Sequence, residues 1–356
     1  MTVFLYASKP TNFSDSLFNS LFPNTFKILP SMQRSYRSRC TRKDMARDGL
    51  DFSEAKRPAA FRLCKVSGYM TELLEIRADD PKLHVLFIPG NPGIVAFYKD
   101  FVESLYEFLG GHASVTAIGH VSHTKKNWER GRLFSLEEQI LHKVDFINQE
   151  LENLEVPILL VGHSIGSYMA IDVFRRSSEK VTYCIGLYPF LAVNPQSRWQ
   201  SIVGKIVESQ VLSVALSCIA ASLGSLPSSA YRLILTNSVG SSWSAAAVEA
   251  ACSHLVQYQV VRNILFLTMT EFRKLAETPD WKFMREKREK IAFLFGVDDH
   301  WGPLQMHKEI SKQVPGISLS IERAHPHTFS CTEDGSSCVA KHVARLIQNQ
   351  VLHSGQ

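Results

Sequence analysis

The sequence lacks the features by which disulfide-linked, metal-binding and repeat proteins are usually recognised. Its seven cysteines include no CxxC pair and follow no secretory signal peptide, so we expect reduced thiols in an intracellular protein rather than a disulfide framework. Cys331 and Cys338 are close in sequence, but no histidine stands beside them at metal-ligand spacing, and we interpret them as structural. No internal repeat is visible. The sequence therefore predicts neither a metal site nor a cofactor.

Most of the chain also lacks an excess of charge of either sign. The formal net charge of +5 arises in residues 1–43, which hold seven basic residues and one acid, whereas the rest of the chain holds 32 basic and 33 acidic residues. The body therefore has no basic excess that would predict binding to nucleic acid. The tail, rich in serine, phenylalanine and arginine, has the composition of an organelle transit peptide. An extension without a targeting role and a start at Met45 are the alternatives.

Strand-like and helix-like segments alternate along the body of the chain. The runs typical of strands are Phe61–Val66, Glu72–Ile76, His84–Ile88, Ser114–Ile118, Val156–Val161, Val181–Leu187, Ile291–Phe295 and Ile317–Ile321. Helical spacing of apolar residues predicts helices at about Ala96–Leu109, from Leu136 to Leu154, over Ile165–Arg176 and at about Val339–Val351. Ser135 and Glu138 form a capping-box pattern before the second of these helices. The alternation predicts an α/β fold with a mostly parallel sheet flanked by helices.

The strongest indication of chemistry is the pentapeptide Gly162-His163-Ser164-Ile165-Gly166, which has the pattern GxSxG. It lies directly between a buried strand and a helix, the context in which this pattern forms a nucleophile elbow. The chain must turn sharply there, so Ser164 is expected in a strained backbone conformation, and side chains at positions 162 and 166 would clash with neighbouring elements. The helix N-terminus that follows favours negative charge near the serine. We therefore predict that Ser164 is a catalytic nucleophile in an α/β-hydrolase fold.

A serine nucleophile needs a base that removes its proton and an acid that orients the base. In this fold the acid and then the histidine follow the serine along the chain. The run Ile291–Phe295 leads into Asp298 and Asp299, at the carboxyl end of a strand, where sites in parallel sheets are built. We favour Asp299, which comes three residues after a glycine, and Asp298 is the alternative.

The base is expected after the next strand, where His325 and His327 both lie. Pro326 restricts the backbone of His325 to extended conformations. Phe329 is placed to pack beside this loop and hold His327. We favour His327 as the base, with His325 as the alternative, and we interpret His300 as a loop residue beside the acid.

Acyl transfer also requires hydrogen-bond donors for the negatively charged oxygen of the tetrahedral intermediate. In this fold one donor is the backbone N–H of the residue after the nucleophile, here Ile165. The second donor is expected from the loop Pro89-Gly90-Asn91-Pro92-Gly93, which follows a buried strand. Because proline has no N–H group, Asn91 is the natural donor in this loop. The alternative is a turn without a functional role.

Four separate motifs together resemble those of the lipid droplet-associated hydrolases. They are PGNPG after the third strand, GHSIGSY at the elbow, GxxDxW at the acid and PHxF at the histidine. The resemblance covers roughly residues 83–350 and implies a serine hydrolase of α/β-hydrolase fold at neutral-lipid droplets. It implies Ser164 as nucleophile, Asp299 as charge-relay acid and His327 as base. The sequence departs from the family pattern at His300, where the family often has proline, and in its N-terminal extension.

The expected organisation is a disordered or targeting extension over residues 1–58 and an α/β-hydrolase domain over residues 59–352. About a hundred residues between Leu187 and Ile291 interrupt the alternation, and we interpret residues 189–288 as an inserted, largely helical cap. The predicted function is hydrolysis of lipid esters through an acyl-enzyme, with cholesteryl esters or acylglycerols as the substrates that the resemblance implies. The alternatives are a droplet surface or scaffold protein with negligible turnover, and a thioesterase or small-ester hydrolase.

A long segment of the cap, from position 209 to position 231, lacks charged residues. A membrane-spanning helix needs about 20 predominantly apolar residues, and the serines and Pro227 of this segment argue against a full span. We therefore predict an element that enters one lipid monolayer, with a buried cap helix over the substrate as the alternative. Together with the resemblance, this segment predicts contact with the lipid droplet monolayer or the endoplasmic reticulum membrane surface. The expected location is the lipid droplet, with the endoplasmic reticulum as a second site.

Overall fold

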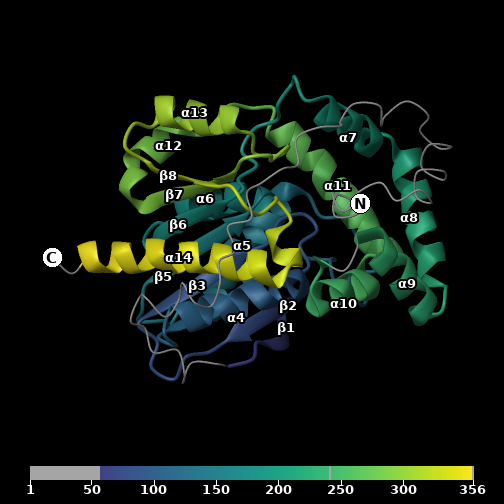
Figure 1. The fold of residues 1–356 in the computed structure, drawn as a ribbon, viewed down its shortest axis with the longest axis horizontal. Helices are drawn as coiled ribbons and strands as arrows, with labels where there is room; N and C mark the ends of the chain where they lie inside the picture. Colours follow the sequence, from purple (N-terminus) through teal and green to yellow (C-terminus); the bar gives the residue numbers. More distant parts are fainter. Residues whose placement is uncertain (1–56, 240–241, 355–356) are drawn as a thin grey trace.

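An eight-stranded sheet forms the centre of the protein (Figure 1). The computed structural model describes residues 57–239 and 242–354, so nearly all of the expected extension over residues 1–58, with its transit-peptide composition, lies outside the described residues. The strands are β1 (Ala60–Val66), β2 (Tyr69–Ile76), β3 (Leu83–Ile88), β4 (Ala113–Ile118), β5 (Ile158–His163), β6 (Val181–Leu187), β7 (Ile291–Gly296) and β8 (Ser318–Glu322).

The strands lie in the order β1-β2-β4-β3-β5-β6-β7-β8. The pairs β1–β2 and β2–β4 are antiparallel, and all the pairs from β4 to β8 are parallel. The predicted α/β class with a mostly parallel sheet is confirmed. Because the parallel strands all run the same way, their carboxyl ends meet at one edge, and loops from β3, β5, β7 and β8 can form a single site there.

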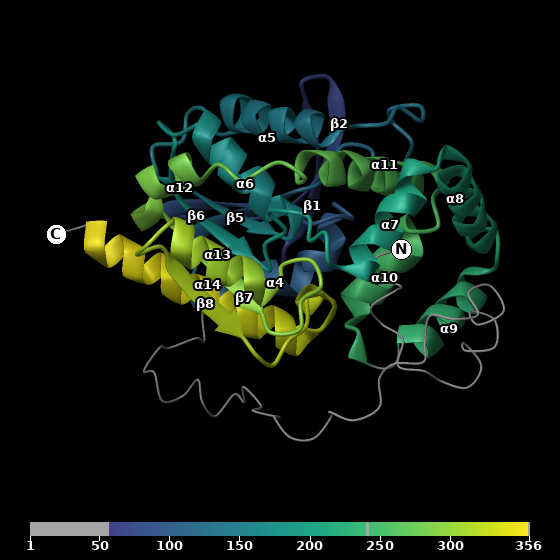
Figure 2. The same ribbon diagram turned by 90° about the horizontal axis from the view of Figure 1, so that it is seen from above.

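Helices cover both faces of the sheet (Figures 1 and 2). One face carries η1 (Val95–Tyr98), α4 (Lys99–Phe108) and α14 (Glu333–Ser354), and the other carries α5 (Leu136–Glu150), α6 (Ile165–Arg176) and α13 (Leu304–Gln313). Strand β3 shows how the two faces are specified. Val85 and Phe87 belong to the core under α4 and α14, whereas Leu86 and Ile88 belong to the opposite core. Alternate side chains of a strand point to opposite faces, so a continuously apolar strand serves both cores.

Most element boundaries agree with the sequence prediction, but the last helix does not. It begins at Glu333 rather than near Val339. The buried apolar stripe that predicted it starts only at Val339, while the preceding turn is polar and contains Gly335. That turn is helical because the N–H of Gly335 donates to Oγ1 of Thr332 over 3.1 Å and because acidic residues are stabilised at a helix N-terminus.

The segment between β6 and β7 is largely helical, as predicted. Its helices are α7 (Arg198–Glu208), α8 (Gln210–Gly224), α9 (Ser228–Val239), α10 (Ala245–His254), α11 (Tyr258–Lys274) and α12 (Trp281–Glu286), followed by η3 (Arg288–Lys290). Helices α7 to α10 gather at one side of the molecule, and α11 runs from them toward the sheet (Figure 2). Helix α12 lies apart from this group, where Phe283 packs edge-on against Phe174 of α6 at 5.5 Å between ring centroids. The last part of the segment therefore completes the core beneath α6.

For the uncharged segment 209–231, a buried cap helix was the alternative to an element that enters a lipid monolayer. Helix α8, which forms most of this segment, is not buried. Its buried side chains are Ser213 and Ser217, and much of its apolar surface is exposed. Within residues 57–239 and 242–354, no single helix is both long and apolar enough to cross a membrane, although α7 and α8 together reach that length and composition with a 90° bend between them.

The turn from β5 to α6 depends on two glycines. A Cβ atom at Gly162 would lie 2.1 Å from the carbonyl oxygen of Gly166, and one at Gly166 would lie 2.3 Å from the carbonyl oxygen of Ile88. Neither backbone atom can move without opening the turn or the sheet, so the predicted clash of side chains at positions 162 and 166 is confirmed.

Replacing Gly162 by alanine is expected to lower the free energy of unfolding by about 3 kcal/mol, because the new methyl group meets backbone rather than a flexible side chain. Gly204 on α7 is the matched control, since a Cβ there would lie an ordinary 3.5 Å from Phe272 and alanine favours a helix. Denaturant unfolding of both variants measures the difference. A wild-type unfolding midpoint for Gly162→Ala would contradict the close contact.

Candidate active site

Ser164 lies at the tip of the turn between β5 and α6. Its backbone angles are φ 56° and ψ −123°, a conformation that a residue with a side chain adopts only when its surroundings hold it there. The N–H of Ser164 donates to the carbonyl of Leu187 over 2.9 Å, and its own carbonyl accepts the N–H groups of Ser167 and Phe190. The predicted strained turn is therefore present, and it exposes the serine side chain to a cavity.

A buried hydrogen bond joins His327 to Asp299. Nδ1 of His327 donates to Oδ2 of Asp299 over 2.9 Å, and Oδ1 of Asp299 accepts the backbone N–H of Trp301 over 2.8 Å. Because a carboxylate can only accept, the proton of a neutral His327 ring lies on Nδ1 and the lone pair lies on Nε2. His327 lines the same cavity as Ser164, so the structure brings together the three residues favoured from the sequence. Asp298, the alternative acid, is exposed.

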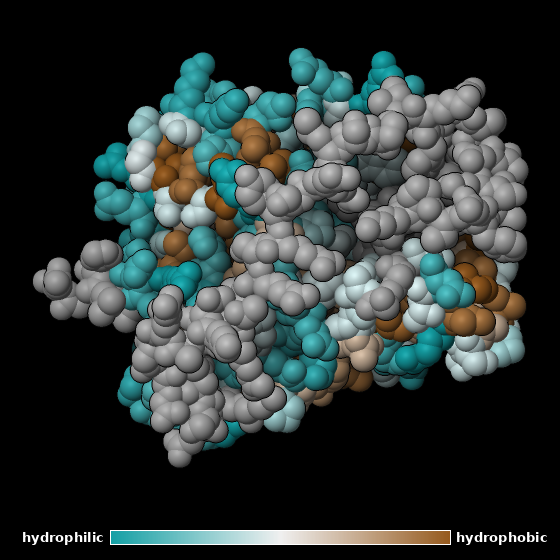
Figure 3. Space-filling view, in the orientation of Figure 1, coloured by the Kyte–Doolittle hydropathy of each residue, from teal (hydrophilic) through white to brown (hydrophobic). Residues whose placement is uncertain are grey.

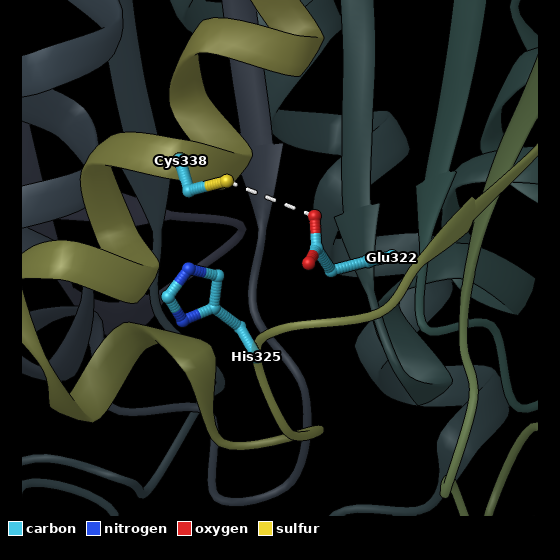
Figure 4. Close-up of side chains that lie close together, drawn as sticks. All are labelled: Glu322, His325 and Cys338. Atoms are coloured by element: carbon cyan, nitrogen blue, oxygen red, sulfur yellow. Dashed lines mark hydrogen bonds between the residues drawn. The ribbon is translucent and has the colours of Figure 1, made fainter. Parts of the chain in front are cut away.

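His325, the alternative base, points into a different cluster (Figure 4). With Glu322 at the end of β8 and Cys338 on α14, it brings a nitrogen, an oxygen and a sulfur atom within 4.8 Å of one another. These are donor types that zinc accepts. None of the three residues lines the cavity of Ser164, so His325, unlike His327, lies outside the site. Sequence spacing did not reveal this grouping because its members come from separate segments.

The loop after β3 runs directly against the elbow. A Cβ atom at Gly90 would come within 3.0 Å of the Cβ of Ser164, and Asn91 lines the cavity beside it. The N–H of Gly90 donates to the hydroxyl of Tyr98 over 3.1 Å. The N–H groups of Asn91 and Ile165, in contrast, donate to no other residue in the described part of the chain. These are the two donors that the sequence predicted for an oxyanion.

A chain of hydrogen bonds links this loop to the histidine loop. The hydroxyl of Tyr98 lies 2.7 Å from Nδ1 of His163, and Nε2 of His163 lies 3.1 Å from the carbonyl oxygen of His327. A carbonyl only accepts, so Nε2 carries the proton, and Nδ1 must accept from Tyr98. Burial lowers the pKa of His163 well below its usual value, which keeps the ring neutral in this arrangement. The chain Gly90–Tyr98–His163–His327 therefore fixes both loops against the elbow.

Buried aromatic rings that do not line the cavity pack around this chain. Phe329 is buried, with its ring centroid 5.1 Å from that of His163 and 5.4 Å from that of Tyr188. The hydroxyl of Tyr188 donates to the carbonyl of His325 over 3.0 Å. The predicted packing of Phe329 beside the histidine loop is confirmed. Tyr98 and Tyr188 were missed because neither lies in a recognisable pattern, while His163 lay within the GxSxG motif but had no assigned role.

The cap reaches the cavity through α11. Thr268 and Glu271 of this helix line the cavity, and both are buried. Nδ2 of Asn91 donates to Oγ1 of Thr268 over 2.9 Å and to Oε1 of Glu271 over 3.1 Å. Burial raises the pKa of Glu271 to about 8, although the hydrogen bond from Asn91 acts in the opposite direction. No sequence pattern marked this carboxyl group.

The sheet order, the flanking helices and the serine at the strand–helix turn define the class of this protein as an α/β-hydrolase. Solved structures agree with that fold. A bacterial membrane phospholipase A matches with a TM-score of 0.59 and 13% identity, covering 82% of this chain and 87% of its own. An epoxide hydrolase from Vigna radiata matches with a TM-score of 0.59 and 14% identity, covering 82% of this chain and 99% of its own. Similarities at such low sequence identity establish a shared fold and nothing further.

The chain belongs to the lipid-droplet associated hydrolase family, whose model matches residues 81–330. The lipid droplet-associated hydrolase of Dictyostelium discoideum is 26% identical over 272 residues, which cover 73% of this chain and 86% of that protein. The Homo sapiens protein of the same name is 25% identical over 267 residues, covering 70% and 80%. The resemblance stated from the four motifs is confirmed, and the protein is a hydrolase by family and fold.

Replacing Tyr98 by phenylalanine is expected to lower the free energy of unfolding by about 2 kcal/mol, because the N–H of Gly90 and Nδ1 of His163 each lose a buried partner. Tyr183 on β6 is the matched control: it is also buried, and no residue in the described ranges bonds to its hydroxyl. Tyr183→Phe should change stability by less than about 0.5 kcal/mol. Equal midpoints for the two variants in denaturant unfolding would show that the chain through Tyr98 is not formed.

Proposed function

We propose that this hydrolase is a serine esterase that cleaves neutral lipid esters at the lipid droplet surface, with Ser164 as nucleophile, His327 as base and Asp299 as the acid that orients it. The observation that carries the proposal is the buried 2.9 Å hydrogen bond between His327 and Asp299 at the cavity that Ser164 lines. That bond leaves the lone pair of the ring on Nε2, the atom that a base in this arrangement uses.

In the proposed reaction, Oγ of Ser164 attacks the ester carbonyl carbon while Nε2 of His327 takes its proton. The carboxylate of Asp299 stabilises the imidazolium ion that forms. As the C–O bond of the ester breaks, His327 gives the proton to the alcohol oxygen, and the acyl group remains on Ser164. A water molecule, deprotonated by His327, then attacks the acyl carbonyl and releases the acid.

The negative charge of each tetrahedral intermediate requires donors that are already in place. The N–H groups of Asn91 and Ile165 suit this role because no described residue accepts from them, and because Ile165 opens α6, whose N-terminus favours negative charge. Among the described residues that line the cavity none is a lysine or an arginine, and aromatic rings of Phe97, Phe190 and Trp301 contribute to it. This lining favours an uncharged ester over an anionic one.

Contact with lipid is supported by an apolar surface on the cap. The exposed apolar side chains of α8, α9 and the turn between them are Val211, Leu212, Val214, Ile219, Leu223, Leu226, Leu233 and Ile234. Figure 3 shows apolar surface at the right-hand edge of the molecule, where these helices lie. No charged residue interrupts the segment from 209 to 231. Helices of this kind can insert an apolar face into a lipid monolayer without crossing it, and the curated relatives carry lipid droplet association in their names.

A fluorophosphonate probe is expected to label the wild-type protein at Ser164, and Ser164→Ala should abolish the labelling. Asp299→Asn should slow it by about 10⁴-fold, because the amide favours the wrong tautomer of His327. Asp298→Asn, at an exposed neighbouring carboxylate, should label at the wild-type rate. Mass spectrometry of the labelled peptide gives the site, and undiminished labelling of Ser164→Ala would refute the assignment of the nucleophile.

Introducing lysines on the exposed apolar surface of the cap should reduce lipid association without affecting the probe reaction. A triple variant Val211→Lys, Ile219→Lys and Leu233→Lys changes side chains that are 77%, 58% and 61% exposed. Since each such side chain contributes about 1.5–3 kcal/mol when it leaves water, the floating fraction in droplet flotation should fall about tenfold or more. Leu63→Lys, at a side chain on edge strand β1 that is 50% exposed, is the control and should float normally. Unchanged flotation of the triple variant would contradict the proposed docking face.

A further inference from the structure

We infer that Glu271 of the cap helix α11 is a positioning residue for the oxyanion-binding loop. Its carboxyl group holds the side chain of Asn91 and so fixes the backbone N–H of that residue at the cavity. The inference rests on the proposed function, because it concerns the same site. The cap, and not the sheet alone, then holds the N–H of Asn91 in place before a substrate binds.

The contacts of Asn91 with the cap come from one face of one helix. Nδ2 of Asn91 lies 3.0 Å from the carbonyl oxygen of Ile264, 2.9 Å from Oγ1 of Thr268 and 3.1 Å from Oε1 of Glu271. Spacings of four and then three residues place these groups on successive turns of the same side of α11. The amide donors of Asn91 are therefore taken up by the cap, and its backbone N–H is the donor that remains for a substrate oxygen.

Among these acceptors Glu271 is the group whose charge can change. It is buried, and the basic residues next to it on α11 are engaged elsewhere: Arg273 pairs with Glu208 at 2.9 Å, and Lys274 pairs with Glu277 at 2.6 Å. Burial without a cationic partner raises the pKa of Glu271 to about 8, so the protonated, neutral carboxyl group predominates at pH 7. A neutral carboxyl group accepts from Asn91 without opposing the negative charge of an oxyanion, whereas the ionised group opposes it.

Three other titratable groups that line the cavity, Tyr98, Cys331 and His163, do not change charge near pH 8. Burial raises the pKa of Tyr98 and raises that of Cys331 to about 12, and it lowers the pKa of His163 well below its usual value. We therefore assign the expected loss of activity at alkaline pH to the ionisation of Glu271.

The test is the second-order rate constant for fluorophosphonate labelling of Ser164 between pH 6 and pH 10. The wild-type rate should fall about tenfold between pH 7 and pH 9.5 as Glu271 ionises beside the developing charge. Glu271→Gln keeps an acceptor for Asn91 and cannot ionise, so its rate at pH 7 should be close to that of the wild type and should not fall above pH 8. Glu271→Leu removes the acceptor and should label about ten- to a hundredfold more slowly at every pH.

A matched control comes from an exposed carboxylate of the cap. Glu249→Gln removes an exposed acid of the cap that pairs with Arg232 rather than with Arg273 or Lys274, and it should keep the wild-type profile. Circular dichroism of each variant checks that the cap is folded. The inference is wrong if Glu271→Leu labels at the wild-type rate, or if Glu271→Gln retains the alkaline fall.

A second measurement tests the role of Glu271 independently of the assignment of Ser164 as nucleophile. The side-chain amide resonances of Asn91, assigned by selective ¹⁵N labelling, should shift with an apparent pKa near 8 in the wild type and stay constant in Glu271→Gln. An Asn91 amide that does not titrate overturns the role of Glu271 whatever the labelling shows. An amide that titrates in a protein that the probe does not label would support the contact and count against Ser164 as nucleophile.

Discussion

The site depends on one backbone constraint, the turn at Ser164. The positive φ of Ser164 is held because two close approaches leave no room for a Cβ. Gly162 of β5 lies against the start of α6, and Gly166 of α6 lies against Ile88 at the end of β3. Leu187 accepts the N–H of the serine and thereby ties the turn to the end of β6. The second of these approaches also brings the loop after β3 against the serine. The loop after β3 and the histidine loop both lie against the turn, the first at Gly90 and the second through His163.

Two polar connections then join the remaining loops to the turn. From one side the chain through Tyr98 and His163 reaches the carbonyl of His327, so that the histidine loop is attached to the motif residue next to the nucleophile. From the other side Asn91 is bound by α11 of the cap. The cap therefore carries both the exposed apolar surface that we propose contacts lipid and the hydrogen bonds to the loop that we propose binds the oxyanion.

The features that could be predicted from the sequence are those that depend on a local pattern of residues. Alternating apolar runs located the strands, and GxSxG between a strand and a helix identified the turn at Ser164. Loop positions after β7 and β8 pointed to Asp299 and His327, although only the folded chain separates His327 from His325, since both follow the same strand. Glu271 could not be predicted, because its environment is created by a loop that lies 180 residues away in the sequence. The same limit hid the role of Tyr98, whose partners are contributed by two different loops.

We propose that Ser164 forms an acyl-enzyme with an ester substrate, and this intermediate can be trapped. Intact protein mixed with a p-nitrophenyl ester, quenched in acid within the first turnover and digested, can be mapped by mass spectrometry. We expect one acyl group, carried by the peptide that contains Ser164, and a burst of p-nitrophenol of about one equivalent per protein molecule. Nitrophenol release without any acylated Ser164, or an acyl group on another residue, would contradict the proposal.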